Sequence, residues 1–158
     1  MSSKIHQTAL SFLNGLSNLS SESLLAVLTP TATSEFAPSS ISPHPPKNPI
    51  TFTNHIAAMK DVFSTIPVIP KEIFANEEKS QVTIWATSMA NFRDEVKDDG
   101  LLDEEWRFER EYIFILTMDE SREKIARNFM FVDGKANDRL RELIARARRN
   151  LQQKSAVS

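Results

Sequence analysis

The spacing of apolar residues changes once along this chain, near Pro67, and that change constrains the fold most strongly. Before Pro67, apolar residues recur every three or four positions, as at Ile5, Ala9 and Phe12, which is typical of amphipathic helices. After it, stretches rich in Ile, Val, Phe, Trp and Thr alternate with turn residues, which is typical of strands. Helices followed by strands predict an α+β domain, with a cone-shaped, curved antiparallel sheet closing over the helices.

We expect residues 1–158 to form a single domain. Six of the eight prolines fall between residues 29 and 49, which predicts a stiff irregular loop. Because this loop carries Phe36 and Ile41, we expect it to wrap over the domain at the mouth of a cavity. The expected elements are helices over 5–16 and 20–28, a third helix from Thr51 or Thr53 to Ile66, strands over 68–74, 81–92, 105–118 and 124–132, and a basic helix over about 136–152.

Composition excludes several classes of function. The net charge of −2 argues against a dedicated nucleic-acid binder. Without cysteine there is no disulfide framework, thiol nucleophile or Cys-based metal site. No two of the three histidines are spaced i,i+4, and the three glycines are far apart, so neither a metal site nor a phosphate loop is predicted. No apolar run approaches a membrane span or a signal peptide, so we expect a cytoplasmic protein without metal or cofactor.

Four segments are similar to motifs of the nuclear transport factor 2-like superfamily, in its SnoaL-like branch. They resemble most those of small fungal isomerases and cyclases that act on polyketide, meroterpenoid or alkaloid intermediates. This resemblance implies a cone-shaped domain with an apolar cavity, and a homodimer formed through the outer sheet face. The segments are Pro38-Ser39-Ser40-Ile41 with Pro46-Lys47-Asn48-Pro49, Phe52-Thr53-Asn54-His55, Phe108 to Phe114, and Lys124-Ile125 with Phe131-Val132-Asp133.

The chain also departs from these relatives. Where they often read Tyr-x-Asn-Glu-Tyr, this sequence has Phe108 and keeps Tyr112. Met130 replaces the glutamate of Glu-Phe-Val-Asp, and Ser34 stands where His or Arg is often expected. If those family positions hold the acid–base groups, most are lost here, and shaping the substrate would contribute more than strong acid–base catalysis.

Tyr112 and Arg110 are candidate catalytic residues, because strand alternation places both on the more aromatic face of the strand over 105–118. The Tyr112 hydroxyl would donate to a carbonyl and stabilise an enolate-like transition state; alternatively it is a structural core tyrosine. Arg110 would bind a carboxylate or polarise a carbonyl, or else lie at the sheet edge in water.

His55 is the third catalytic candidate. We expect it in the first turn of the third helix, where the positive end of the helix dipole disfavours the imidazolium and leaves a neutral base; the alternative is an exposed histidine. His44 would project over the cavity mouth or into solvent. Expected substrate contacts are Trp106, Phe108, Asn128, Met130, Trp85, Phe63 and Met59, with Trp85 and Met89 alternatively in a dimer interface.

These residues favour a cofactor-independent isomerase or cyclase for a hydrophobic, oxygenated natural-product intermediate. A non-catalytic ligand-binding or dimeric scaffold protein of the same fold is the alternative, because fold does not fix function. A dehydratase or epoxide hydrolase would need a carboxylate in the cone, for which Asp61 is the candidate. The arginines of the last helix are expected to form a solvated face, balanced by the acidic segment 94–105.

Overall fold

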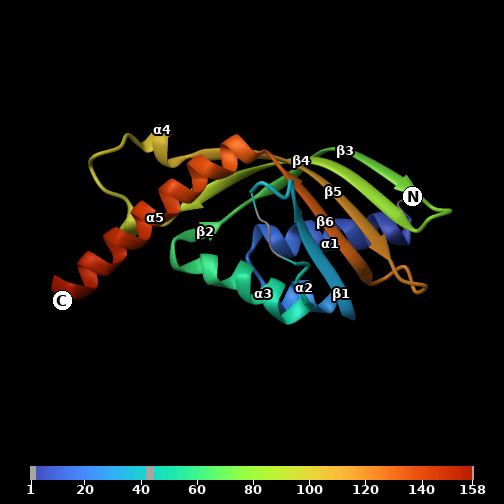
Figure 1. Cartoon of the computed structure of the whole chain (residues 1–158). Helices are drawn as coiled ribbons and strands as arrows, with labels where there is room; N and C mark the ends of the chain where they lie inside the picture. The colour runs from blue at the N-terminus through green and yellow to red at the C-terminus, as the bar shows by residue number, and fades with distance from the viewer. Residues whose placement is uncertain (1–2, 42–44, 158) are drawn as a thin grey trace.

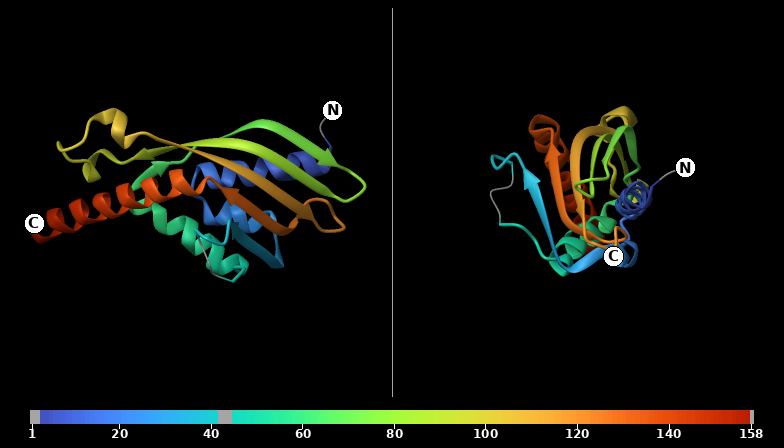
Figure 2. Two further views of the ribbon diagram at one scale, coloured as in Figure 1. Left: turned by 45° about the horizontal axis from the view of Figure 1, so that its top comes forward. Right: turned by 90° about the vertical axis from the view of Figure 1, so that its right-hand side faces the viewer.

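One six-stranded mixed sheet curls around the N-terminal helices (Figures 1 and 2). It is seen in a computed structural model that describes residues 3–41 and 45–157. The strand order is β1-β6-β5-β4-β2, with β3 also paired to β4; β1 and β6 are parallel and the other pairs antiparallel. The strands are β1 (Leu28–Ala37), β2 (Phe63–Thr65), β3 (Val68–Asn76), β4 (Gln81–Phe92), β5 (Phe108–Met118) and β6 (Ile125–Val132).

Three helices precede most of the sheet and one long helix follows it (Figure 1). Ser3 caps the first and Ser20 the second, each accepting a backbone N–H three residues on, as small hydroxyl side chains do at helix starts. The helices are α1 (Lys4–Ser17), α2 (Ser21–Ala26), α3 (Pro49–Ala58), the single turn α4 (Asp103–Trp106) and α5 (Gly134–Val157). None of the described helices is long and apolar enough to cross a membrane.

The core lies between the inner face of the sheet and the N-terminal helices. Every second residue of β4 is buried, because alternate side chains of a strand point to one face. Phe12 of α1 is fully buried, stacked on Phe52 of α3 with its ring edge-to-face against Phe114 of β5. The α+β class and the alternation predicted for β5 and β6 are therefore confirmed.

Several expected boundaries are wrong. The first part of the proline-rich segment is strand β1, because Pro30 lies on an edge strand, at a break in the pairing with β6, where a missing N–H is tolerated. The third helix begins at Pro49, since Asn48 and not a threonine caps it, and ends at Ala58. The chain then continues through a 3-10 turn into β2.

The last helix is longer than predicted. Asp133 caps it through bonds from the backbone N–H groups of Lys135 and Ala136. Since β6 ends at Val132 and α5 begins at Gly134, a single residue separates the strand from the helix. The helix then extends away from the sheet toward the C-terminus, far from the N-terminus (Figure 1).

Candidate active site

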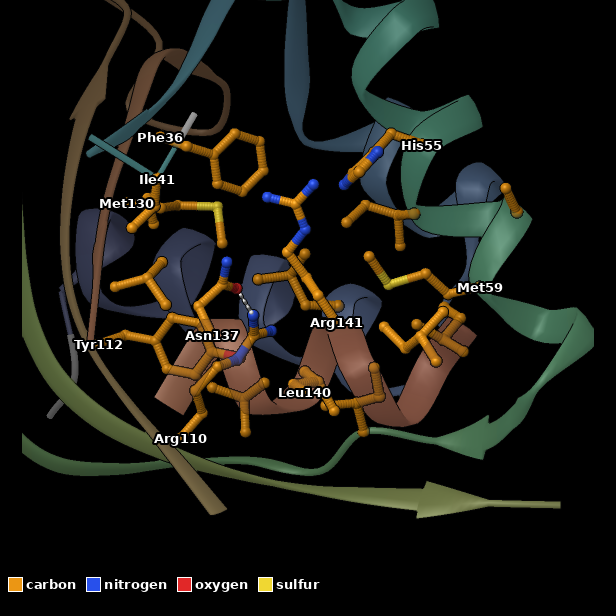
Figure 3. A pocket seen from close by; sticks show the side chains of 18 of the residues that line it. Phe36, Ile41, His55, Met59, Arg110, Tyr112, Met130, Asn137, Leu140 and Arg141 are labelled. Carbon is orange, nitrogen blue, oxygen red and sulfur yellow. Dashed lines mark hydrogen bonds between the residues drawn. The ribbon is translucent and has the colours of Figure 1, made fainter. Parts of the chain in front are cut away.

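A cavity of about 680 Å³ opens between α3, α5 and the inner face of β5 and β6 (Figure 3). Most of its lining is apolar, which suits a hydrophobic ligand. The expectation that Phe36 and Ile41 lie at this cavity is confirmed. The other large apolar residues of the lining are Leu16, Leu19, Ile56, Met59, Ile66, Val68, Phe114, Met130, Val132, Leu140 and Ile144.

Four polar side chains form a hydrogen-bonded chain along one wall, hereafter the polar relay: Ser88, Tyr112, Arg110 and Asn137. The Ser88 Oγ lies 2.8 Å from the Tyr112 hydroxyl. Arg110 donates from Nε to the same hydroxyl at 2.9 Å and from Nη1 to Asn137 Oδ1 at 2.6 Å. Tyr112 and Ser88 are only 4% and 3% exposed, so the bond between them is shielded from water and helps to fix the tyrosine in place.

The polar relay restricts what the Tyr112 proton can do. Arg110 has only donors, so the hydroxyl of Tyr112 must accept from it. If Ser88 also donates, both acceptor positions of the hydroxyl are filled and its own proton is available to a ligand in the cavity. Two neighbours hold the ring: Phe114 stacks on it at 5.2 Å between centroids, and the Arg110 guanidinium lies 5.0 Å from the ring centroid.

His55 lies across the cavity from Tyr112 (Figure 3). Burial of the imidazole lowers its pKa below the ordinary value of 6.5, and the charges of Lys47, Arg110 and Arg148 lower it further. The residue as a whole is nevertheless exposed, as the alternative expectation for it had it, with its ring edge-to-face against Phe36 at 5.7 Å between centroids. The helix dipole is not the cause, because His55 lies in the last turn of α3 rather than the first.

Cations line the cavity, and no carboxylate of the described residues does so. The cations are Lys47, Arg110, Arg141 and Arg148. Arg148 is paired with Asp61, whose carboxylate lies 3.0 Å from its Nε but is not part of the lining. The carboxylate that a dehydratase or epoxide hydrolase would need is therefore not supplied by Asp61.

Five of the residues nominated from the sequence meet at this cavity. Tyr112, Arg110 and His55 lie there with Met59 and Met130. His44 lies outside the described residues.

Five other expected substrate contacts lie elsewhere. Phe63 is fully buried on β2 against Phe92, because the third helix stops before it. Trp106 belongs to α4 rather than to a strand, and it packs on the other side of Phe92. Phe108 packs against the core without lining the cavity.

Asn128 and Trp85 are the remaining two. Asn128 points inward as predicted, but it is fully buried and bonded to Ser34 of β1, so no ligand reaches it. Trp85 points to the outer face of the sheet, where its Nε1 donates to Glu111 and Lys71 lies over its ring.

Sequence reasoning missed Ser88, Asn137 and Arg141. Ser88 occupies a buried position of β4 directly opposite Arg110, and a small polar residue in an otherwise apolar buried row is a usable signal. Asn137, Arg141 and Arg148 recur at helical spacing with Leu140 and Ile144, so they share one face of α5. The expectation that all arginines of this helix form a solvated face is therefore wrong for Arg141 and Arg148, which line the cavity.

The fold is shared with several fungal proteins of known structure. AusH from Aspergillus nidulans is 24% identical over 82% of this chain and 84% of its own, with a TM-score of 0.69. PrhC from Penicillium brasilianum is 17% identical over 95% of each chain, with a TM-score of 0.77. The BvnE pinacolase from Penicillium brevicompactum is 15% identical over 90% and 91%, with a TM-score of 0.75.

This chain has the cone-shaped nuclear transport factor 2-like fold. The fold predicted from the sequence motifs is thus confirmed. No protein-family model and no curated protein sequence matches the chain.

Proposed function

We propose that this protein is a cofactor-independent tailoring enzyme, an isomerase or cyclase for a hydrophobic, oxygenated natural-product intermediate. The observation that carries the proposal is the polar relay, which holds Tyr112 and Arg110 at the wall of an apolar cavity with His55 on the opposite side. The likeness in fold to a pinacolase supports a rearrangement within a single substrate.

The proposed chemistry uses three groups. Tyr112 donates a hydrogen bond to a carbonyl oxygen of the substrate, and the Arg110 guanidinium stabilises negative charge that develops there. His55, neutral because its pKa is lowered, accepts a proton from one carbon of the framework on the far side and returns it to another, so the mass of the substrate is unchanged. Enclosure by apolar walls orients the substrate between them.

Two observations favour this proposal over its alternatives. A purely binding or scaffold protein would not require a tyrosine bonded to both a serine and an arginine at its cavity. A dehydratase or epoxide hydrolase would need a carboxylate, and the polar side chains of the described lining are all cationic or neutral.

The test is conversion of a metabolite extract from the source organism lacking this gene, followed by mass spectrometry. Wild-type protein should convert one compound into an isomer of the same mass, and Tyr112→Phe should not. Gain or loss of water would instead indicate a hydrolase or dehydratase. A compound bound but unchanged would overturn the proposal in favour of a binding protein.

We also propose that the protein forms a homodimer through the outer sheet face. Trp85, Ile113 and Phe131 stand in register across β4, β5 and β6, and Ile113 and Phe131 are 37% and 45% exposed. Contiguous apolar side chains of this kind are commonly covered by a partner. Light scattering should give twice the chain mass for wild type and the chain mass for Phe131→Lys; a monomeric wild type would refute the dimer.

A further inference from the structure

We infer that the ligand of this cavity is an apolar molecule carrying one carboxylate, and that Arg141 is the residue that selects it. The inference rests on the proposed function for placing the substrate in this cavity. It goes further in naming the charge of the substrate and the residue that recognises it.

The first step is the charge balance of the lining. Of its four permanent cations, only Arg148 has a carboxylate partner among the described residues, and that partner is Asp61. Arg110 bonds to the neutral groups Tyr112 and Asn137. The cavity is therefore positive although the chain carries a net charge of −2, and a concave surface of one sign concentrates ligands of the opposite sign.

The second step is the state of Arg141. Its side chain reaches from α5 into the cavity, toward Phe36 and His55 (Figure 3). Within residues 3–41 and 45–157, no hydrogen bond or ion pair engages its guanidinium. By contrast, Arg146 and Arg148 on the same helix are both bonded to carboxylates.

The third step is the position of Lys47. Two backbone bonds to Ser34, at 2.9 and 2.7 Å, hold the segment that carries it. Its ammonium lies 6.0 Å from the centroid of the ring of Phe36, the residue toward which Arg141 points. His55 is in the same region but is uncharged near neutral pH because its pKa is lowered. Arg141 and Lys47 are thus the groups left to balance an anion.

The chemistry of these groups indicates a carboxylate. A guanidinium presents parallel N–H donors that match the two oxygens of a carboxylate, and no described residue bonds to those of Arg141. The rest of the lining near it, with Phe36, Ile41 and Met130, is apolar. A ligand with an apolar body and one carboxylate satisfies both parts of the cavity.

The test compares 2-naphthoate with 2-naphthamide by isothermal titration calorimetry at pH 7.5. The two compounds have nearly the same shape, but only the acid is charged there. Wild-type protein should bind the acid about tenfold more tightly than the amide, and Arg141→Gln should weaken only the acid, by about tenfold. The control is Arg149→Gln, an exposed arginine of the same helix outside the lining, which should leave both affinities unchanged.

Three results would overturn the inference: equal affinity of the wild type for both compounds, no binding of either at millimolar concentration, or an equal loss of acid affinity in both variants. The measurement involves no turnover, so it is separate from the test of the proposed function. Preference for the acid together with no conversion of any metabolite would refute the enzyme and keep the carboxylate site. Conversion of a metabolite without preference for the acid would keep the enzyme and refute the carboxylate site.

Discussion

Ser88 and Arg110 face each other across β4 and β5, and both bond to the same hydroxyl, that of Tyr112. The register of the two strands creates this arrangement, because Ser88 pairs with Arg110 and Ala86 pairs with Tyr112. The small side chain of Ala86 leaves the tyrosine ring room to lie along the sheet. The pairing of β4 with β5 therefore positions the Tyr112 hydroxyl, together with its hydrogen bonds to Ser88 and Arg110.

Replacing Tyr112 by Phe should lower kcat by about 10²–10³-fold, as removal of a preorganised donor to a developing oxyanion does. The ring and its stack on Phe114 stay in place, so the far-ultraviolet circular dichroism spectrum should be unchanged. Initial rates on the converted metabolite provide the measurement. Full turnover by this variant would show that the hydroxyl has no catalytic part.

Ser88→Ala should lower kcat by a smaller factor, about tenfold, because Tyr112 keeps its bond from Arg110. Combining it with Tyr112→Phe should add nothing, since the two residues act through one hydroxyl. Ser64→Ala is a matched control, because that hydroxyl bonds to the Asn91 carbonyl on β4, outside the cavity lining. Independent, multiplying effects of Ser88 and Tyr112 would contradict the polar relay.

The pH profile should report His55. Because its pKa lies below 6.5 in the folded protein, the neutral base persists at pH 6.5, and kcat/KM should fall only on the acid side of that value. The unfolded chain binds this proton more readily, so the free energy of unfolding should also decrease as the pH falls below about 6.5. His55→Gln should abolish the acid limb, and His6→Gln should leave it unchanged.

Asp98 should stabilise the fold through α5. Its carboxylate accepts two bonds from Arg146, at 2.8 and 2.6 Å, and one from Asn150 at 2.7 Å. These bonds hold the pKa of Asp98 well below its ordinary value. Asp98→Asn should lower the Tm at pH 7 by roughly 2–4 °C, measured by differential scanning calorimetry.

The same pKa fixes the sign of the pH dependence. The carboxylate of Asp98 contributes stability above its unfolded pKa near 3.8 and loses it as the pH falls further, toward the folded pKa. Wild type and Asp98→Asn should thus converge in acid. The control is Asp94→Asn, which should not change the Tm because the Asp94 side chain is fully exposed. A difference in Tm between wild type and Asp98→Asn that stays constant down to pH 2 would argue against the ion pair.

Phe63 and Met59 should separate stability from ligand binding. Phe63→Ala should lower the free energy of unfolding by about 3–5 kcal/mol, since the ring is fully buried, and urea denaturation measures this. Met59→Ala should affect stability less and weaken 2-naphthoate binding, because Met59 lines the cavity and is only partly buried. If Phe63→Ala instead weakened 2-naphthoate binding and Met59→Ala caused the larger loss of stability, Phe63 would be a ligand contact after all.

Periodicity predicted most of the sheet because β4, β5 and β6 each bury one face. The predicted limits of β4 agree with the structure at both ends. Alternation together with the family resemblance predicts that Tyr112 and Met130 face the same pocket, and both are buried on the inner face. Strand β1 was not predicted, because its proline is typical of a loop. Pro30 is tolerated in this strand because β1 lies at the edge of the sheet. Edge position is a property of the whole sheet, which local sequence does not encode.

The site was harder to predict than the fold, because it combines distant segments. The bond from Arg110 to Asn137 joins β5 to α5 across 27 positions of sequence. Similarly, Trp106 follows the strand alternation of Phe108 but lies in α4, where a single helical turn points it at Phe92. Such contacts follow from how the elements pack, not from their individual patterns.

The placement of the polar residues has a consequence for protein design. Ser88, Tyr112 and Arg110 are built on two paired strands, whereas Arg141 is carried by α5. Among the described residues of α5, Asn137 alone is bonded to one of these three strand residues, Arg110. The sequence of α5 could therefore be replaced as long as asparagine is kept at position 137. Such an exchange would change which ligands the protein accepts and leave the Tyr112 hydroxyl in place.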